Sequence, residues 1–134
     1  AVKTGGGCNH RFGLYDGVLI KDNHIKAFGG ISKAVQRIRQ HKGHLLRIEV
    51  EVTNFEELAE ALKNHVDVIM LDNMDPGEVK KAVSLINGQA LVEVSGGVTL
   101  DTMAELAATG VDIISVGALT HSARAVDMSM EIIN

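Results

Sequence analysis

Cysteine, aromatic residues and positive charge are scarce in this sequence, and each shortage excludes a class of protein. Cys8 is the single cysteine, so no intrachain disulfide can form, and we expect a reducing, cytoplasmic location. Aromatic residues make up 3% of the chain and the net charge is -4. We therefore expect no nucleic-acid partner, because such proteins need a basic face or stacking rings.

Long hydrophobic runs are also missing. No apolar run approaches the roughly 18 residues that a membrane span needs, and the first residues lack the charged-then-apolar pattern of a secretory leader. We therefore expect no membrane partner. The 134 residues suffice for one domain with its own core, and a start at Ala1 rather than at Met suggests part of a longer protein.

Short runs rich in β-branched residues alternate with helical patterns along the chain. The runs lie near residues 17–21, 45–52, 66–72, 90–95 and 112–117. This alternation is typical of a parallel sheet covered by helices. Five strands are too few for a closed eight-stranded barrel. We therefore predict an α/β fold: a partial, open or incomplete TIM-like β/α barrel with parallel strands and outer helices.

Apolar residues recur at helical spacing in four segments, which begin near Ile31, Asn54, Asp75 and Thr99. Asn54 and Glu57 have the spacing of a capping box. Pro76 stands where a first helical residue is expected. We predict a fifth helix from about Ala123 to Ile133.

The predicted strands carry charge on one face. In "RIEVEV" the isoleucine and valines share one face, while Arg47, Glu49 and Glu51 share the other. In "LVEVSGG" the valines oppose Glu93 and Ser95. A sheet covered by helices on both faces would be apolar on both, so we predict a barrel with a polar interior. Buried carboxylates need partners. If these charges serve only to stabilise the fold, Arg47 would form an ion pair with Glu49 or Glu93.

Polar residues or glycine end all five predicted strands: Lys21, Glu51, Asp72, Ser95 and Gly117. Parallel α/β proteins place their active sites at this end of the sheet. Glu51 and Asp72 could act as acid and base or hold a divalent cation. We favour Mg²⁺, which takes one or two carboxylates together with substrate oxygens. A lone cysteine, and histidines without ligand spacing on one element, argue against zinc.

Two glycine-containing loops follow the last two predicted strands. "SGGV" at residues 95–98 precedes the helix that Thr99 begins, and "SVGALTHS" places Gly117 and His121 after the next strand. Backbone N–H groups and a helix N-terminus favour an anion in such loops. Each loop alone is also an ordinary turn, but the adjacent pair indicates a phosphate site.

Cationic side chains stand on both sides of the first predicted strand. His10 and Arg11 precede it, and Lys21 follows it. Arginine binds carboxylates through two parallel hydrogen bonds, so the three residues together would suit a small polyanion. In the alternative in which these residues have no binding role, Arg11 is a surface charge and His10 is a turn residue.

The motifs "GGGCNHRFGLYDGVLIKDNHI", "IEVEV", "MLDNM", "EVSGGV" and "ISVGALTHSA" closely resemble, in order and spacing, those of the quinolinate phosphoribosyltransferase family. The resemblance covers residues 1–134, which would form the C-terminal part of the family's α/β-barrel domain. It implies that the family's N-terminal α/β domain lies outside this sequence.

The resemblance implies an enzyme that joins quinolinate to phosphoribosyl pyrophosphate. The products would be nicotinate mononucleotide, pyrophosphate and CO2, with Mg²⁺ as cofactor, in NAD biosynthesis. It also implies a homodimer or a higher homo-oligomer.

The resemblance assigns roles to matched residues. His10, Arg11 and Lys21 would bind quinolinate. Glu51 and Asp72 would serve the metal and the ribose, and with Lys21 would be the catalytic residues. The ribose phosphate would be bound by a further set: Ser95, Gly96, Gly117 and His121.

Three alternatives to this enzyme stay open. One is a non-catalytic barrel that binds a phosphate ligand without turnover. Another is a related family member from molybdenum transport operons with an uncertain substrate. The third is a structural fragment whose charges are paired internally.

Overall fold

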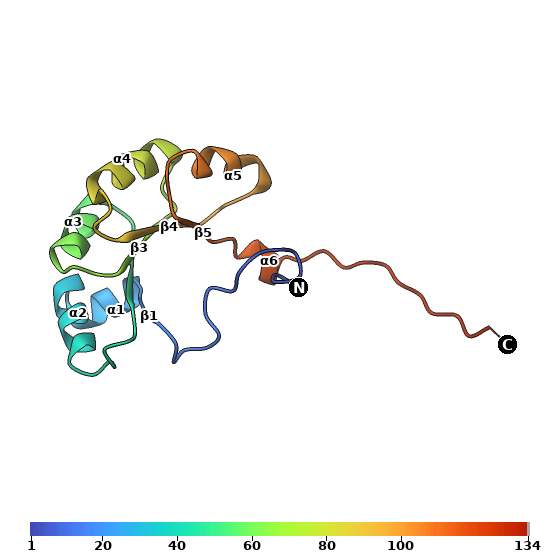
Figure 1. Ribbon diagram of the computed structural model, residues 1–134, viewed down its shortest axis with the longest axis horizontal. Helices are drawn as coiled ribbons and strands as arrows, with labels where there is room; N and C mark the ends of the chain where they lie inside the picture. The colour runs from blue at the N-terminus through green and yellow to red at the C-terminus, as the bar shows by residue number, and fades with distance from the viewer. Residues whose placement is uncertain (134) are drawn as a thin grey trace.

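Five parallel strands form one sheet in which the order in space equals the order in the sequence: β1 (Val18–Ile20), β2 (Ile48–Val52), β3 (Val68–Asp72), β4 (Leu91–Ser95) and β5 (Ile113–Ile114). The computed structural model describes residues 1–133. The sheet curves into an open arc, with β1 and β5 at its two edges (Figure 1). The predicted α/β fold with an unclosed barrel is confirmed.

The connections between strands are helical: α1 (Asp22–Phe28), α2 (Ile31–Arg39), α3 (Phe55–Lys63), α4 (Pro76–Ile86) and α5 (Leu100–Ala107), with α6 (Ala118–His121) after β5. Helices α1 to α5 line the outer, convex side of the arc (Figure 1). Parallel neighbours require such crossovers, because a short turn cannot return the chain to the same end of the sheet.

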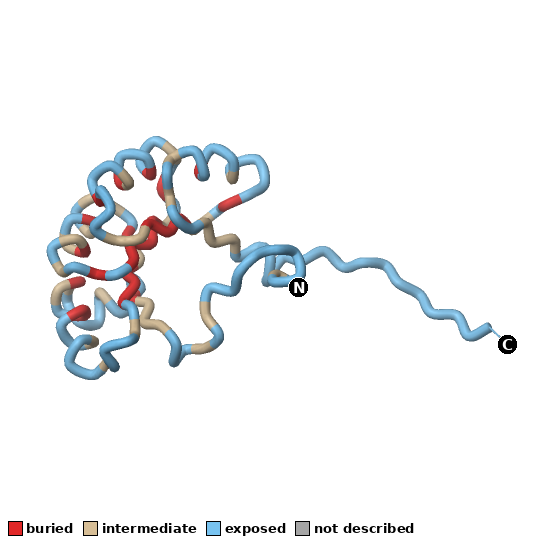
Figure 2. The backbone as a smooth tube through the Cα atoms, viewed as in Figure 1, coloured by how far each residue is buried: buried red, intermediate tan, exposed pale blue. Residues whose placement is uncertain are grey.

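The core lies between the sheet and the helices. The outward face of β2 and β3 contributes fully buried side chains such as Val50, Ile69 and Leu71. Helices α2 and α4 meet this face with Val35 and Val79, which are also fully buried. Figure 2 shows buried segments along the strands and the inner sides of the helices. The apolar face predicted for the strands is therefore the helix-covered face.

Helix starts largely follow the capping residues. Asn54 accepts a hydrogen bond from the backbone N–H of Glu57 at 2.9 Å, as predicted. The Glu57 carboxylate, however, accepts from the backbone N–H of Thr53 at 2.8 Å rather than from that of Asn54. Asp75 and Glu78 form the complete reciprocal pair at the start of α4.

Helix α1 was not predicted from the sequence, which showed only a polar run after the first strand. The backbone N–H of Lys21 donates to Nδ1 of His24 at 3.0 Å, which satisfies one polar group at the helix start. Gly29 ends α1 in the left-handed conformation, with φ of 74°, that glycine adopts readily. The polar run therefore belongs to a capped helix.

The helix predicted from Ala123 to Ile133 is wrong: these residues have no regular secondary structure and are exposed. Their apolar residues alternate with polar ones, as Val126, Met128, Met130 and Ile132 show. That period of two gives a helix no continuous apolar face. The segment extends away from the arc (Figure 1).

The predicted strand 112–117 is shorter than expected, because β5 holds only Ile113 and Ile114. It pairs with β4 alone, through Glu93 and Val94. None of the helices formed by residues 1–133 combines the length and apolar character needed to cross a membrane.

Candidate active site

The carboxyl ends of β1 and β2 bring two of the predicted catalytic residues together. Lys21 Nζ lies 3.4 Å from Glu51 Oε2. The Lys21 side chain is half-exposed, whereas that of Glu51 is 13% exposed. A single amine therefore faces a largely buried carboxylate at the rim of the sheet.

Asp72 and Ser95 end β3 and β4 as register partners. Because Glu51 pairs with Met70, two residues before Asp72, the two carboxylates project from the same face of neighbouring strands. Asn73 follows Asp72 with φ of 54°, and its backbone N–H donates to the carbonyl of Ser95 at 3.0 Å. The predicted convergence of Lys21, Glu51, Asp72 and Ser95 at one rim thus agrees with their positions in the sheet.

The "SGGV" loop is shaped by close packing against Asn73. Gly96 has φ of 89°, and a Cβ placed there would lie 2.8 Å from the backbone nitrogen of Asn73. Gly97 has φ of 60° with open space around it. Only glycine tolerates the position of Gly96, because any side chain there would collide with Asn73.

The second predicted phosphate loop lies beyond β5. Gly117 precedes α6, and a Cβ on it would lie 2.9 Å from His121 Nε2, so the imidazole folds over the glycine. Nδ1 of His121 is hydrogen-bonded to Ser122 Oγ at 2.8 Å. Helix α6 projects away from the layer of α1 to α5 (Figure 1). The shared role of the two loops in phosphate binding stays a prediction.

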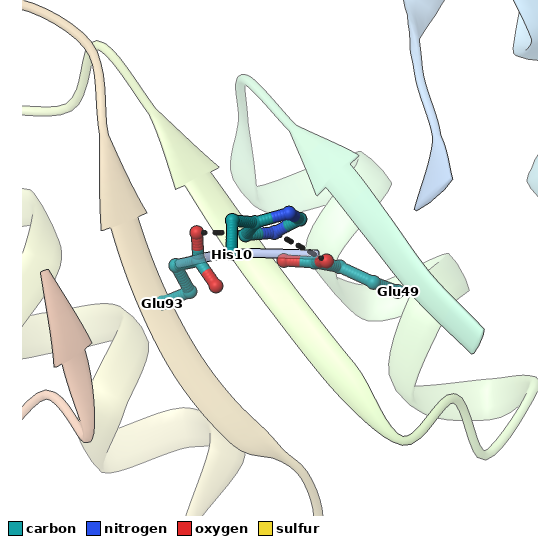
Figure 3. Close-up of side chains that lie close together, drawn as sticks. All are labelled: His10, Glu49 and Glu93. Atoms are coloured by element: carbon teal, nitrogen blue, oxygen red, sulfur yellow. Dashed lines mark hydrogen bonds and ion pairs between the residues drawn. The ribbon is translucent and has the colours of Figure 1, made fainter. Parts of the chain in front are cut away.

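His10 has a different neighbourhood from Lys21. Its Nε2 lies 3.1 Å from Glu49 Oε2 and 3.6 Å from Glu93 Oε1, so the ring stands between carboxylates of β2 and β4 (Figure 3). Glu49 is 8% exposed and Glu93 is 2% exposed. Among the described residues, His10 rather than Arg47 is within ion-pair distance of these carboxylates, which corrects the pairing expected from the sequence.

The pKa of the Glu49 carboxyl is strongly perturbed by its surroundings. Burial, and then the charge of Glu93, raise the pKa of Glu49 to about 8, while Arg11 acts in the opposite direction. Ser115 Oγ donates to Glu93 Oε1. Glu49 Oε1 is buried and, among the described residues, has no hydrogen-bond partner. The pair therefore binds a proton or another cation readily at neutral pH.

A cavity of about 270 Å³ opens beside this cluster. His10, Arg11 and Arg47 line it together with Glu49 and Glu93. Asp16, also on its wall, accepts hydrogen bonds from the backbone N–H groups of Phe12 and Gly13, which shape the turn after Arg11. These bonds lower the pKa of Asp16.

The structure thus separates residues that were predicted to share one pocket. His10 and Arg11 line the cavity near the amino ends of the strands, whereas Lys21 lies at the carboxyl end of β1. Glu49 and Glu93 were noticed in the sequence only as charges needing partners. Glu49 and Glu93 lie two residues before Glu51 and Ser95 on the same strands. Because side chains two apart on a strand share a face, this spacing could have predicted that they lie one layer deeper in the sheet.

A parallel sheet of βα units, charged on its inner face and polar at its carboxyl rim, is the architecture of barrel-type α/β proteins. Residues 1–131 match the family described as "Quinolinate phosphoribosyl transferase, C-terminal domain". The chain therefore belongs to the quinolinate phosphoribosyltransferase family, as the motif resemblance implied.

Curated relatives and solved structures agree with this assignment. The chain is 48% identical over 132 residues to the probable nicotinate-nucleotide pyrophosphorylase [carboxylating] of Bacillus subtilis, covering 98% of this chain and 46% of that protein. It is 45% identical to quinolinate phosphoribosyltransferase [decarboxylating] 2b of Nicotiana tabacum over 150 residues, 98% of this chain and 43% of that one.

The structure of the nicotinate-nucleotide pyrophosphorylase from Francisella tularensis superposes with a TM-score of 0.88 at 45% identity, over 96% of this chain and 45% of that chain. The chain thus spans about half the length of the curated relatives that it matches.

Proposed function

We propose that this chain is the barrel part of an enzyme that transfers a phosphoribosyl group from phosphoribosyl pyrophosphate to quinolinate, releasing pyrophosphate and CO2 and giving nicotinate mononucleotide for NAD biosynthesis. The main support is the rim at which Lys21, Glu51, Asp72 and Ser95 converge in a chain of this family.

The chemistry of the transfer suits a carboxylate at this rim. Departure of pyrophosphate builds positive charge on the ribose ring, and a preorganised carboxylate such as Glu51 stabilises that charge. The attacking atom is the pyridine nitrogen of the acid, so no nucleophilic side chain is needed and the protein mainly positions the substrates. The alkylated, cationic nitrogen then stabilises the carbanion that CO2 leaves behind.

Glu51 and Asp72 fit a Mg²⁺ ion. They present carboxylate oxygens from neighbouring strands on one face, and two protein carboxylates are the number that Mg²⁺ commonly takes when substrate phosphates and water complete its shell. When bound, the ion would neutralise charge on the departing pyrophosphate. Ser95, Gly96, Gly117 and His121 remain the proposed phosphate residues.

His10, Arg11 and Lys21 are proposed to bind the quinolinate carboxylates. The cavity lined by His10 and Arg11 and the amine of Lys21 lie at successive depths of the same inner face. Glu51 forms an ion pair with Lys21. An acid carboxylate would compete for this amine and draw it away from Glu51, which frees Glu51 to face the ribose.

Titration calorimetry on the chain tests this function. Phosphoribosyl pyrophosphate with Mg²⁺ should bind, and quinolinate should bind separately. Lys21→Ala should weaken quinolinate binding at least about tenfold, because a charge-assisted contact is lost, and leave phosphoribosyl pyrophosphate binding nearly unchanged. Lys26→Ala is the matched control, since Lys26 pairs with Asp22 on the exposed side of α1. Equal losses for both ligands would contradict the assigned pocket.

Release of CO2 from labelled quinolinate separates the enzyme from a non-catalytic barrel that only binds the sugar phosphate. Binding without release would favour the binding module. Light scattering would test the proposed homodimer or higher homo-oligomer. The cytoplasmic location expected from the lone Cys8 stays a prediction.

A further inference from the structure

The cluster of His10, Glu49 and Glu93 has the composition of a metal site, and the proposed transfer chemistry gives its two carboxylates no role. One ligand atom from each residue, an imidazole nitrogen and two carboxylate oxygens, lies within 4.8 Å of the other two. The three come from the coil before β1 and from strands β2 and β4, so tertiary structure alone brings them together (Figure 3).

The cluster has more negative than positive charge. The side chains of Glu49 and Glu93 are 11% and 3% exposed, and one imidazole is their ion-pair partner. Arg11 and Arg47 line the adjoining cavity, but among the described residues neither forms an ion pair with Glu49 or Glu93. A single imidazole cannot neutralise two buried carboxylates, so the pair must hold a proton or bind a further cation.

The buried Oε1 of Glu49 gives the second observation. It has no hydrogen-bond partner among the described residues, and the carboxylate extends from β2 toward His10 and Glu93 (Figure 3). Buried polar atoms in folded proteins are nearly always satisfied by a protein group, water or an ion. This oxygen is therefore free to accept a further ligand of the cluster.

We propose that His10, Glu49 and Glu93 bind a divalent transition-metal ion of the Zn²⁺ type, in the interior of the sheet and separate from the Mg²⁺ proposed at Glu51 and Asp72. An imidazole with two carboxylates suits Zn²⁺, Mn²⁺ or Fe²⁺, whereas Mg²⁺ prefers oxygen ligands alone. The sequence argument against zinc considered histidines on single elements, whereas this cluster draws its residues from three segments of the chain.

The site has a consequence for the pocket beside it. A metal on Nε2 of His10 leaves the ring proton on Nδ1. That N–H becomes a fixed donor, and the metal holds the loop with Arg11 against β2 and β4. The ion would thus order the cationic wall of the cavity, where the proposed acid substrate would lie.

Zn²⁺ titration of the metal-free chain, monitored by calorimetry without either substrate, tests the site. One Zn²⁺ should bind with micromolar or tighter affinity and raise the melting temperature, because a ligand that binds only the folded state stabilises it. His10→Gln and Glu93→Gln should each weaken binding at least tenfold. The Glu51→Gln, Asp72→Asn double variant should leave Zn²⁺ binding unchanged.

His44→Gln is the control for adventitious binding, because His44 is an exposed histidine far from the cluster in sequence. His10 lies on a coil outside the core, so His10→Gln keeps the test informative if Glu93→Gln fails to fold. Saturable Zn²⁺ binding that survives His10→Gln, or the absence of any binding to the unmodified chain, would overturn the proposal. Because no substrate is present, neither result depends on the transferase assignment.

Discussion

Two layers of the same inner face differ sharply although they are only two residues apart along each strand. In the interior layer, Glu49 and Glu93 are buried and share one imidazole. In the rim layer, Glu51 has a lysine of its own, and Asp72 accepts from the side chain of Asn73 at 2.9 Å. The comparison shows that each rim carboxylate has a side-chain partner of its own, whereas the two interior carboxylates share one imidazole.

The rim would lose its shape most readily at Gly96. Gly96→Ala should destabilise the chain by about 2–4 kcal/mol, the sum of a left-handed backbone penalty and a collision with Asn73. Urea unfolding measures the change. Gly97→Ala, at a positive φ but in open space, should cost only about 1 kcal/mol. Equal costs at the two glycines would show that packing against Asn73 does not shape the rim.

The interior layer should make stability depend on pH. The raised pKa of Glu49 means that the folded chain holds an extra proton, so stability falls as pH rises from about 4.5 toward 8. Glu49→Gln should remove this decline and, in chelator at pH 8, raise the melting temperature by about 4 °C.

Melting curves from pH 5 to 8 give the slope for each variant. Glu51→Gln, on the same strand at the rim, retains Glu49 and should keep the decline. If stability still declines with rising pH in Glu49→Gln, Glu49 does not cause the decline, and the interior layer does not differ electrostatically from the rim.

The smallest effect is expected from the rim ion pair. Lys21→Met should change the free energy of unfolding by less than about 1 kcal/mol, because water screens the half-exposed Lys21 ammonium although Glu51 is largely buried. Thermal melting at low and high salt checks this. If the free energy of unfolding falls several times more than this, Lys21 mainly stabilises the fold rather than binding a ligand.

The sequence predicted the elements that local patterns specify. Alternation in "RIEVEV" identified the face of β2 that packs on helices, and Asn54, Asp75 and Thr99 marked helix starts. Strand ends identified the rim, because parallel strands place their carboxyl ends at one edge.

The rest depended on partners distant in the sequence. His10 lies 39 residues from Glu49, so their contact has no local signal. The segment after Ala123 illustrates the opposite error: its apolar content suggested a helix, but its period of two does not favour one. Helix α1 was missed because its polar start resembled a binding loop, and the hydrogen bond from Lys21 to His24 could not be inferred from composition.

The strictly sequential strand order has a consequence for how the protein is made. Within residues 1–133, each strand hydrogen-bonds only to the strand immediately before or after it in the chain. During translation, each new strand therefore pairs with a strand that has already been synthesised. Each pairing closes a loop of only one βα unit. Assembly can follow the direction of translation, and exchanging one unit between relatives would disturb only its two borders.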